Sequence, residues 1–228
     1  MKTVAVIPAY NEAATIREVA ARTLAVLADV IVVNDGSTDA TAAALEGLPV
    51  TVISNPTNLG KGASLCRGFA LALAEGADAV VTLDGDAQHC PEDIPRLLDA
   101  ARAHPESIII GARLWDRANV PPLRYFGNRF ANFWVAWAAG YPVADSQSGF
   151  RLYPARVLKR VRVFQNRFTF ESEILIEAGR FGVGTAAVPI AALYPPGARR
   201  SHYRTAVDTA RIVRMIAGKL FSPARSEA

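Results

Sequence analysis

The stretch VVTLDGD, residues 80–86, changes from apolar side chains to two aspartates within a few positions. Its first residues, Val80 to Leu83, suit a buried strand, because β-branched and other apolar residues favour extended backbone inside a core. Asp84 and Asp86 follow, with one glycine between them. Their like charges repel each other unless a cation offsets them. The stretch therefore predicts a central strand that ends in a charge-bearing loop.

Similar apolar runs flank this stretch, and helical patterns separate them. We predict strands at 3–10, 30–37, 50–54, 79–84 and 107–113, with helices at 12–27, 38–45, 61–75 and 91–103. Strands that are apolar on both faces and alternate with helices are typical of a parallel sheet covered on both sides. Ligands of such sheets bind beyond the carboxyl ends of the strands. The sequence thus predicts an α/β fold with a mostly parallel central sheet flanked by helices and a polar edge.

The pattern changes after Arg113. We predict a loop over 115–128, a helix rich in aromatic residues, a turn and strand over 145–154, a helix at 169–181 and a strand at 185–196. Aromatic side chains recur at helical spacing, at Phe130, Phe133, Trp134, Trp137 and Tyr141. They indicate either a core face or an interfacial helix, since Trp and Tyr favour the membrane boundary.

Residues 201–228 have a different pattern, that of an amphipathic helix with a frayed end. Apolar residues form one stripe of this segment, and basic residues lie opposite. Such a helix suits either an anionic membrane surface or ordinary packing on the domain.

The composition fits one globular domain with an appendage. The chain has 228 residues, of which 51% are hydrophobic and 20% charged, and a net charge of +4. This excess of positive charge suits anionic partners but is also ordinary for a soluble protein. The sequence shows no secretion signal, and no apolar run reaches the length of about 18 residues that a spanning helix needs. We therefore expect free thiols at Cys66 and Cys90, and a cytoplasmic protein that is either free or peripheral on the cytoplasmic face of a membrane.

The acidic pair predicts a site for a hard cation. Mg²⁺ and Mn²⁺ prefer oxygen ligands and often share them with phosphates of a substrate. A simpler interpretation is that Asp86 caps a helix or solvates a turn. The glycine-rich fingerprints of dinucleotide-binding and P-loop proteins are absent from the sequence. A nucleotide must therefore bind by other means.

Five stretches occur in one order along the chain: PAYNE (8–12), VVNDGSTD (32–39), NLGKG (58–62), DGDAQHCPED (84–93) and DSQSGFR (145–151). Together they resemble family 2 glycosyltransferases with the GT-A fold, a Rossmann-like fold for nucleotide-diphospho-sugar transferases. The closest subgroup is the polyprenol-phosphate, or dolichol-phosphate-type, mannosyl and glucosyl transferases. The resemblance covers residues 1–200, which we predict as the GT-A domain.

The resemblance implies an inverting, metal-dependent transfer of a hexose from a GDP- or UDP-linked sugar, and it implies roles for individual residues. It places Pro8, Tyr10, Glu12, Asp35, Lys61 and Asp84 at the nucleotide sugar, and Asp84, Asp86 and Gln88 at Mg²⁺ or Mn²⁺. Asn34 stands where many relatives carry a second aspartate. No nucleic-acid partner is expected, and the oligomeric state stays open.

Arginines could stabilise the departing diphosphate or bind an acceptor phosphate. The candidates are Arg113, Arg124, Arg129, Arg151, Arg199, Arg200 and Arg204, and we place Arg113 and Arg129 with Asp86 in the catalytic set. Arg113 is the strongest candidate because it ends a predicted strand at the polar edge.

The acceptor decides whether a general base is needed. A sugar hydroxyl requires one, whereas a phosphate monoester is already mostly dianionic at pH 7. Base candidates are Asp145, Glu171 and Glu173. The supply of arginines favours a lipid-linked phosphate, such as polyprenyl phosphate, over a saccharide or glycolipid hydroxyl. A binding protein without turnover has no use for an intact metal site, and a nucleotidyltransferase would need a glycine-rich N-terminal loop.

Overall fold

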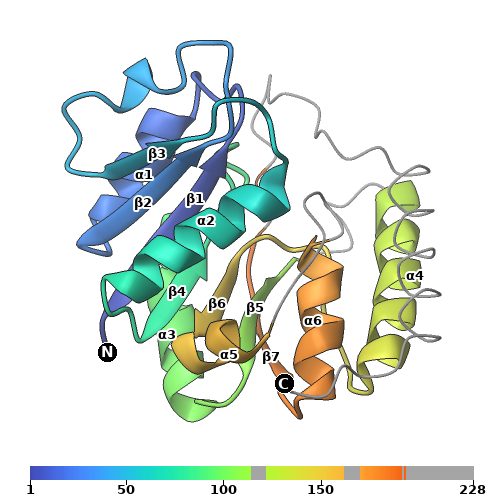
Figure 1. The fold of residues 1–228 in the computed structure, drawn as a ribbon. Coiled ribbons are helices and arrows are strands. Elements are labelled where there is room, and N and C mark those ends of the chain that lie inside the picture. The colour runs from blue at the N-terminus through green and yellow to red at the C-terminus, as the bar shows by residue number, and fades with distance from the viewer. Residues whose placement is uncertain (114–121, 162–169, 192, 194–228) are drawn as a thin grey trace.

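A seven-stranded sheet forms the centre of the protein in the computed structural model, which describes residues 1–113, 122–161, 170–191 and 193 (Figure 1). The strand order is β3-β2-β1-β4-β6-β5-β7. The strands are β1 (Thr3–Ala9), β2 (Asp29–Asn34), β3 (Thr51–Ser54), β4 (Ala79–Thr82), β5 (Ile108–Ala112), β6 (Arg151–Pro154) and β7 (Thr185–Pro189). All neighbours pair in parallel except β6, which runs antiparallel to β4 and β5. The predicted α/β fold with a mostly parallel sheet is confirmed.

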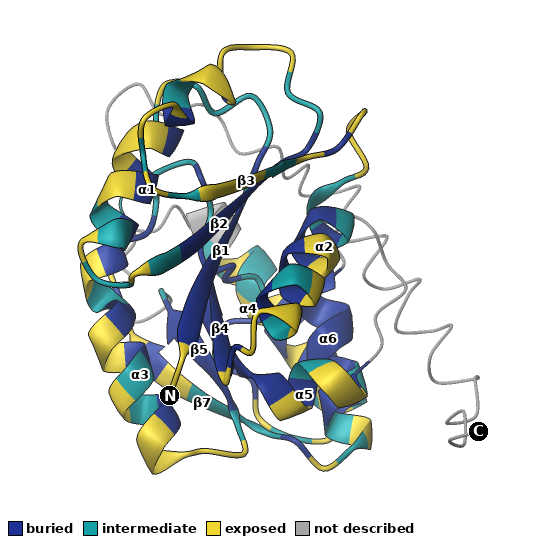
Figure 2. Ribbon diagram, turned by 60° about the vertical axis from the view of Figure 1, so that its left-hand side comes forward, coloured by how far each residue is buried: buried dark blue, intermediate teal, exposed yellow. Residues whose placement is uncertain are grey.

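Helices cover both faces of the sheet (Figure 2). They are α1 (Ile16–Leu24), α2 (Lys61–Ala74), α3 (Ile94–Ala103), α4 (Pro122–Ala139), α5 (Ala155–Arg160) and α6 (Phe170–Arg180), with short 3₁₀ turns η1 (Ala43–Leu45) and η2 (Pro91–Asp93). None of these described helices is long and apolar enough to cross a membrane.

The alternation of side chains along the strands divides the core into two parts. In β1, Val4 and Val6 pack with α2, α4, α5 and α6 on one face. Ala5 and Ile7 point to the other face and pack with α1 and α3. Since successive residues of a strand point to opposite faces, an apolar strand supplies both parts of the core at once. This explains why the central strands read as continuous apolar runs.

Some predicted boundaries were wrong. The helix predicted at 12–27 begins only at Ile16, and the helix predicted at 38–45 shrinks to η1. Polar side chains of the second segment, Asp39 and Thr41, instead accept hydrogen bonds from the backbone of residues 12 and 13. Side chains used in this way compete with helix formation.

The second half differs from prediction in three elements. Helix α4 already begins at Pro122, inside the predicted loop 115–128, and α5 was not predicted at all. Strand β7 ends at Pro189, earlier than the predicted 185–196. The predicted helix and tail at 201–228, and Arg199, Arg200 and Arg204, lie outside the described residues.

Candidate active site

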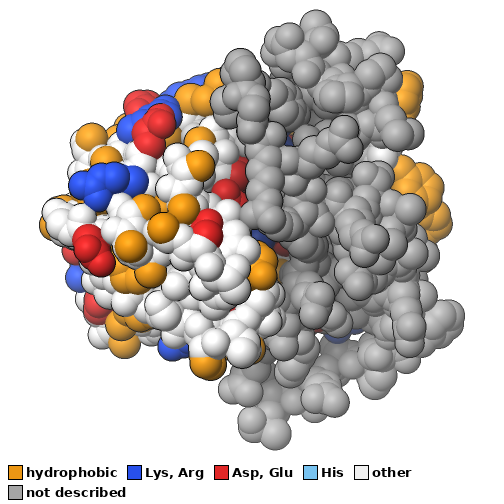
Figure 3. Space-filling view, turned by 90° about the horizontal axis from the view of Figure 1, so that it is seen from above, with side chains coloured by type: hydrophobic (Ala, Val, Ile, Leu, Met, Phe, Trp, Pro, Cys, Tyr) orange, Lys and Arg blue, Asp and Glu red, His pale blue; other side chains and the backbone are white. Residues whose placement is uncertain are grey.

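Loops that follow β1, β2 and β4 meet at the carboxyl edge of the sheet, as predicted. The Glu12 backbone N–H donates to Thr41 Oγ1 at 2.8 Å, and the Thr15 hydroxyl donates to the Gly85 carbonyl at 2.6 Å. A β-carbon at Gly85 would lie 3.5 Å from the Pro8 carbonyl oxygen. The nucleotide residues predicted on β1 therefore lie beside the acidic loop. Figure 3 looks from above onto this edge, where acidic side chains are visible near the middle of the described surface.

Asp35 is buried and organises the loop before α2. Its Oδ1 accepts hydrogen bonds from Asn55 Nδ2 (2.6 Å) and the Leu59 backbone (2.9 Å), and its Oδ2 accepts one from the Gly60 backbone (2.8 Å). Gly60 has φ +94°, a backbone conformation that residues with a side chain rarely adopt. Asp35 thus sets the position from which α2 begins at Lys61.

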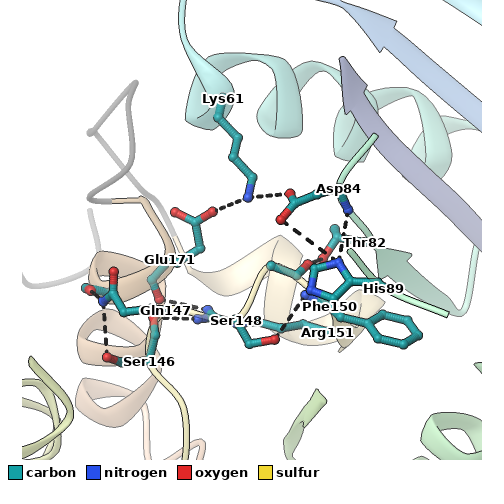
Figure 4. A network of polar contacts seen from close by, with 12 residues as sticks. Lys61, Thr82, Asp84, His89, Ser146, Gln147, Ser148, Phe150, Arg151 and Glu171 are labelled. Atoms are coloured by element: carbon teal, nitrogen blue, oxygen red, sulfur yellow. Dashed lines mark hydrogen bonds and ion pairs between the residues drawn. The ribbon is translucent and has the colours of Figure 1, made fainter. Parts of the chain in front are cut away.

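Lys61 bridges two carboxylates at the centre of the site (Figure 4). Its Nζ lies 2.5 Å from Asp84 Oδ1 and 2.7 Å from Glu171 Oε1. A β-carbon at Gly149 would lie 2.7–2.8 Å from both Asp84 oxygens and from Lys61 Nζ. Only a residue without a side chain permits this approach, so Gly149 belongs to the site.

The two aspartates of the acidic pair differ in their pKa values. Burial raises the pKa of Asp84, but the nearby Lys61 ammonium outweighs it and lowers that pKa to about 2. Burial and the Asp84 charge together raise the pKa of Asp86 to about 6. Asp86 Oδ1 accepts one hydrogen bond, from the Gln88 backbone N–H at 3.1 Å. Asp86 therefore carries a negative charge that the chain offsets poorly.

This donor set fits a divalent cation in its chemistry. Two carboxylates and the Gln88 amide offer the oxygen ligands that Mg²⁺ and Mn²⁺ prefer. The raised pKa of Asp86 marks an excess of negative charge that a cation would neutralise. Within the described part of the chain, no three His, Cys, Asp or Glu side chains cluster as a metal site, so the carboxylates would need the amide and oxygens from water or a bound ligand to complete the coordination.

His89 contacts the start of the acidic loop through one hydrogen bond and packs against Phe150. Its Nδ1 accepts a hydrogen bond from the Asp84 backbone N–H at 3.4 Å, and its ring packs 5.4 Å from the Phe150 ring. Burial lowers the pKa of His89 to about 4, so the ring is neutral at pH 7. Its role, unassigned from the sequence, is that of a support for the strand end.

Arg113 is held in place by a buried carboxylate, that of Asp145. Its Nε lies 3.0 Å from Asp145 Oδ2, and its Nη2 lies 3.3 Å from Asp145 Oδ1. The charge of this guanidinium adds a small effect that favours the ionised form of Asp84 and opposes the rise in the pKa of Asp86. Burial raises the pKa of Asp145, yet Arg113 outweighs it and holds that pKa below its usual range. Asp145 is thus a buried partner of arginine rather than an accessible base.

Helix α4 is tied to this part of the site. The Asn132 amide donates to the Ala144 carbonyl and accepts from the Ser146 backbone, both at 2.8 Å. One turn earlier, Arg129 is exposed, and its Nη1 donates to the Tyr125 hydroxyl at 3.2 Å. Arg129 therefore lies on the helix that is tied to the loop of Asp145, although it has no described contact with the acidic pair.

The exposed face of α4 resolves the two interpretations of its aromatic residues. Ala131, Val135 and Ala139 form the buried face of this helix. Phe126, Phe130, Phe133 and Trp137 are each at least half exposed. The core interpretation is therefore wrong for Phe130, Phe133 and Trp137, whereas Trp134 and Tyr141 pack partly against the core.

Arg151 does not fit the predicted role of an anion contact. It is fully buried, and its guanidinium donates to the carbonyls of Glu171 (2.7 Å) and Ser146 (2.8 Å). The sequence analysis also missed Gly149, Asn132 and the pairing of Glu171 with Lys61. These contacts join segments far apart in the chain, so no local spacing could reveal them.

Comparisons with known proteins identify the family of this chain. Residues 4–162 match the family model described as glycosyl transferase family 2. The chain is 30% identical to the UDP-N-acetylglucosamine–dolichyl-phosphate N-acetylglucosaminyltransferase of Methanococcus voltae, over 83% of this chain and 84% of that protein. It is also 30% identical to the polyprenol monophosphomannose synthase of Mycolicibacterium smegmatis, over 83% of this chain and 76% of that protein.

A solved structure supports the fold. Glucosyl-3-phosphoglycerate synthase from Mycobacterium tuberculosis, in complex with Mn²⁺, UDP and glucosyl-3-phosphoglycerate, aligns with a TM-score of 0.73 and 19% sequence identity. The alignment covers 98% of this chain and 81% of that one. At this identity the likeness establishes a shared architecture.

Proposed function

The chain belongs to glycosyl transferase family 2 and is a glycosyltransferase, and from this premise we propose that it moves a hexose from a nucleoside diphosphate sugar to a polyprenyl-type lipid phosphate. The observation that carries the proposal is that two ion-paired sets of residues lie at one edge of the sheet. Lys61 bridges Asp84 and Glu171 in one set, and Arg113 pairs with Asp145 in the other. The named activities of the two relatives support the choice of acceptor.

The donor side is proposed to lie over β1 and β2. Pro8, Tyr10, Glu12 and Asp35 would line the nucleoside pocket, with Lys61 and Asp84 nearer the diphosphate. Asp35 supports this pocket through the loop it anchors. The nucleoside of the donor, guanosine or uridine, is left open by these residues; UDP occupies the structural relative.

A divalent cation is proposed at Asp84, Asp86 and Gln88. Bound there, Mg²⁺ or Mn²⁺ would act as a Lewis acid toward the oxygens of the leaving diphosphate. The chain's own contribution is to hold Asp84 through Lys61; Asp86, whose pKa burial and the Asp84 charge raise to about 6, is still mostly ionised at pH 7. Mn²⁺ in the structural relative supports this assignment.

The proposed reaction is a single displacement with inversion. A phosphate oxygen of the acceptor attacks the anomeric carbon, the bond from that carbon to the diphosphate oxygen breaks, and the nucleoside diphosphate leaves with the electron pair. A phosphate acceptor needs no general base. In support, the base candidates Asp145, Glu171 and Glu173 are all buried. Arg113 and Arg129 are proposed to orient the acceptor phosphate.

The lipid part of the acceptor suggests a membrane contact through α4 at the cytoplasmic face. The exposed aromatic face consists of Phe126, Phe130, Phe133 and Trp137. Helix α4 contains two arginines and no acidic residue. Aromatic side chains on a cationic helix suit the interface of an anionic bilayer.

A donor screen tests the proposed function. UDP- and GDP-linked hexoses are incubated with the protein, Mn²⁺ and polyprenyl phosphate in detergent, and released nucleoside diphosphate is measured. We expect one donor to be consumed, with loss of turnover in EDTA and in a folded Asp86→Ala variant. Equal turnover in EDTA, or no consumption of any donor by folded protein, would contradict the proposal.

A further inference from the structure

Glu171 connects helix α6 to the acidic site through Lys61. Its Oε1 lies 2.7 Å from Lys61 Nζ, which in turn lies 2.5 Å from Asp84 Oδ1 (Figure 4). We propose that Glu171 is a positioning residue that divides the Lys61 charge between two carboxylates and so keeps Asp84 available to the cation. This inference rests on the proposed function, because it concerns the same cation site.

The position of Glu171 is fixed from two sides. The buried Arg151 guanidinium donates to the Glu171 carbonyl at 2.7 Å, and the Gln147 amide donates to the neighbouring Ser172 hydroxyl at 3.1 Å. The Glu171 side chain itself is 6% exposed. A carboxylate this deeply buried is costly unless a cation pairs with it, and Lys61 is that cation. The geometry thus points to a built contact rather than a chance approach of two surface charges.

Glu171 also has a carboxylate oxygen that can accept a hydrogen bond and that the contact with Lys61 leaves unused. Its Oε2 is buried and has no hydrogen-bond partner among the described residues. Gly149 leaves room beside this cluster, since a β-carbon there would lie 2.8 Å from Lys61 Nζ. The Lys61 ammonium can therefore shift toward Glu171 without meeting a side chain at position 149.

The count of charges explains why the third carboxylate matters. Lys61 pairs with Asp84 and Glu171, and Asp86 follows Asp84 in the same loop, while Arg113 is already matched by Asp145. The cluster therefore holds an excess of two negative charges, which one divalent cation would neutralise. Without Glu171, Lys61 would pair with Asp84 alone and compete with the cation for that carboxylate.

The test is Mn²⁺ binding, measured by the electron paramagnetic resonance signal of the free ion, without donor or acceptor. Glu171→Gln keeps the side-chain shape and removes the charge, and we expect its Kd for Mn²⁺ to rise roughly tenfold. In a Lys61→Met background, the same Glu171→Gln substitution should change the Kd by much less, because its effect passes through Lys61. Glu177→Gln is the matched control: it removes a carboxylate from the same helix, where Glu177 pairs with Arg180, and should bind Mn²⁺ as the wild type does.

The outcomes separate this inference from the proposed function. Wild-type binding with an unchanged Kd in Glu171→Gln would overturn the inference alone, as would an equal loss in the Lys61→Met background. Failure of the wild-type protein to bind Mn²⁺ would overturn both. If circular dichroism shows that Glu171→Gln is unfolded, Glu171→Asp replaces it: this variant keeps the charge, and we expect a Kd within a few-fold of wild type, whereas a loss as large as in Asp86→Ala would count against a role through charge.

Discussion

The carboxylates of the site differ in how the protein meets their charge. Backbone and amide N–H groups surround Asp35, Lys61 pairs with Asp84, and Arg113 pairs with Asp145. Asp86 accepts a single backbone hydrogen bond. Because each of the other three is matched inside the chain, Asp86 is the one among these four whose charge calls for a cation from outside.

The pH dependence of Mn²⁺ binding follows from Asp86. A carboxyl group whose pKa is raised to about 6 carries a proton below that pH and a negative charge above it. A cation must displace this proton, so we expect full Mn²⁺ affinity above about pH 7 and a loss approaching tenfold per pH unit as the pH falls below about 6. Titrations at several pH values would check it. Constant affinity between pH 5 and 7.5 would contradict the role of Asp86.

Asp35→Asn should destabilise the fold. Asp35 now accepts hydrogen bonds from three N–H groups at 2.6–2.9 Å, and the NH₂ group of asparagine would face one or more of these donors. Each buried group left without a hydrogen bond costs about 1–3 kcal/mol. Urea denaturation should show a loss of at least that size. Asp29→Asn is the control, since its partner Lys2 is a surface contact at 3.9 Å, and its effect should stay below about 1 kcal/mol. Equal stability of Asp35→Asn and wild type would rule out the anchoring role.

Among the structural elements, the loop that precedes β6 makes a close approach to the acidic site at Gly149. Gly149 lets the segment before β6 approach Lys61 and Asp84. Its backbone is also fixed, because the Thr82 hydroxyl donates to the Gly149 carbonyl at 2.7 Å. The backbone cannot retreat from an added methyl group without losing that bond.

Gly149→Ala should therefore impair activity while the fold persists. The new methyl group would displace the Asp84 carboxylate, and a shift of about 1 Å at a catalytic group costs on the order of 10²-fold in kcat/KM. Steady-state kinetics with the preferred donor would measure it. Gly184→Ala is the matched control, since a β-carbon there meets nothing within 4 Å. Similar kinetics for both variants would show that the close approach at Gly149 has no catalytic importance.

Helix α4 leads to a prediction about membranes. Replacing Phe130, Phe133 and Trp137 together by serine should weaken binding to vesicles that contain anionic lipid, because these exposed side chains would otherwise enter the interface. Vesicle co-sedimentation measures this binding. Val52→Ser on the edge strand β3 serves as the control, since it removes an exposed apolar side chain elsewhere. Unchanged binding by the triple variant would exclude α4 as the membrane contact.

Sequence patterns predict the elements that depend on local burial, but not those that depend on contacts between distant segments. Strands β1, β2 and β4 and helix α2 follow from apolar runs and helical spacing, because burial on both faces is a local property of the sequence. The start of α1 and the reduction of 38–45 to η1 depend on hydrogen bonds between segments, which no single segment reveals. The same holds for Glu171: its partner Lys61 lies far away in the chain, so the sequence offered Glu171 only as a candidate base.

At the scale of the whole molecule, the reversed strand β6 explains how the two sides of the site meet. Because β6 runs antiparallel, its first residue, Arg151, pairs with Thr82 at the carboxyl end of β4. The loop that precedes β6 and carries Asp145 therefore arrives at the same edge as Asp84. A strictly parallel sheet would have placed that loop at the opposite edge. The topology thus brings the proposed donor and acceptor sides together.

The central claim is that the acceptor group is a phosphate, and one measurement tests it most directly. Single-turnover transfer is compared between a short polyprenyl phosphate and the same prenol without its phosphate, with saturating donor and Mn²⁺. We predict rapid transfer to the phosphate, none to the alcohol, substantial activity in Asp145→Asn that still folds, and severe loss in Arg113→Ala, whose guanidinium would no longer bind the acceptor. Efficient transfer to the free alcohol would contradict the account and favour a hydroxyl acceptor.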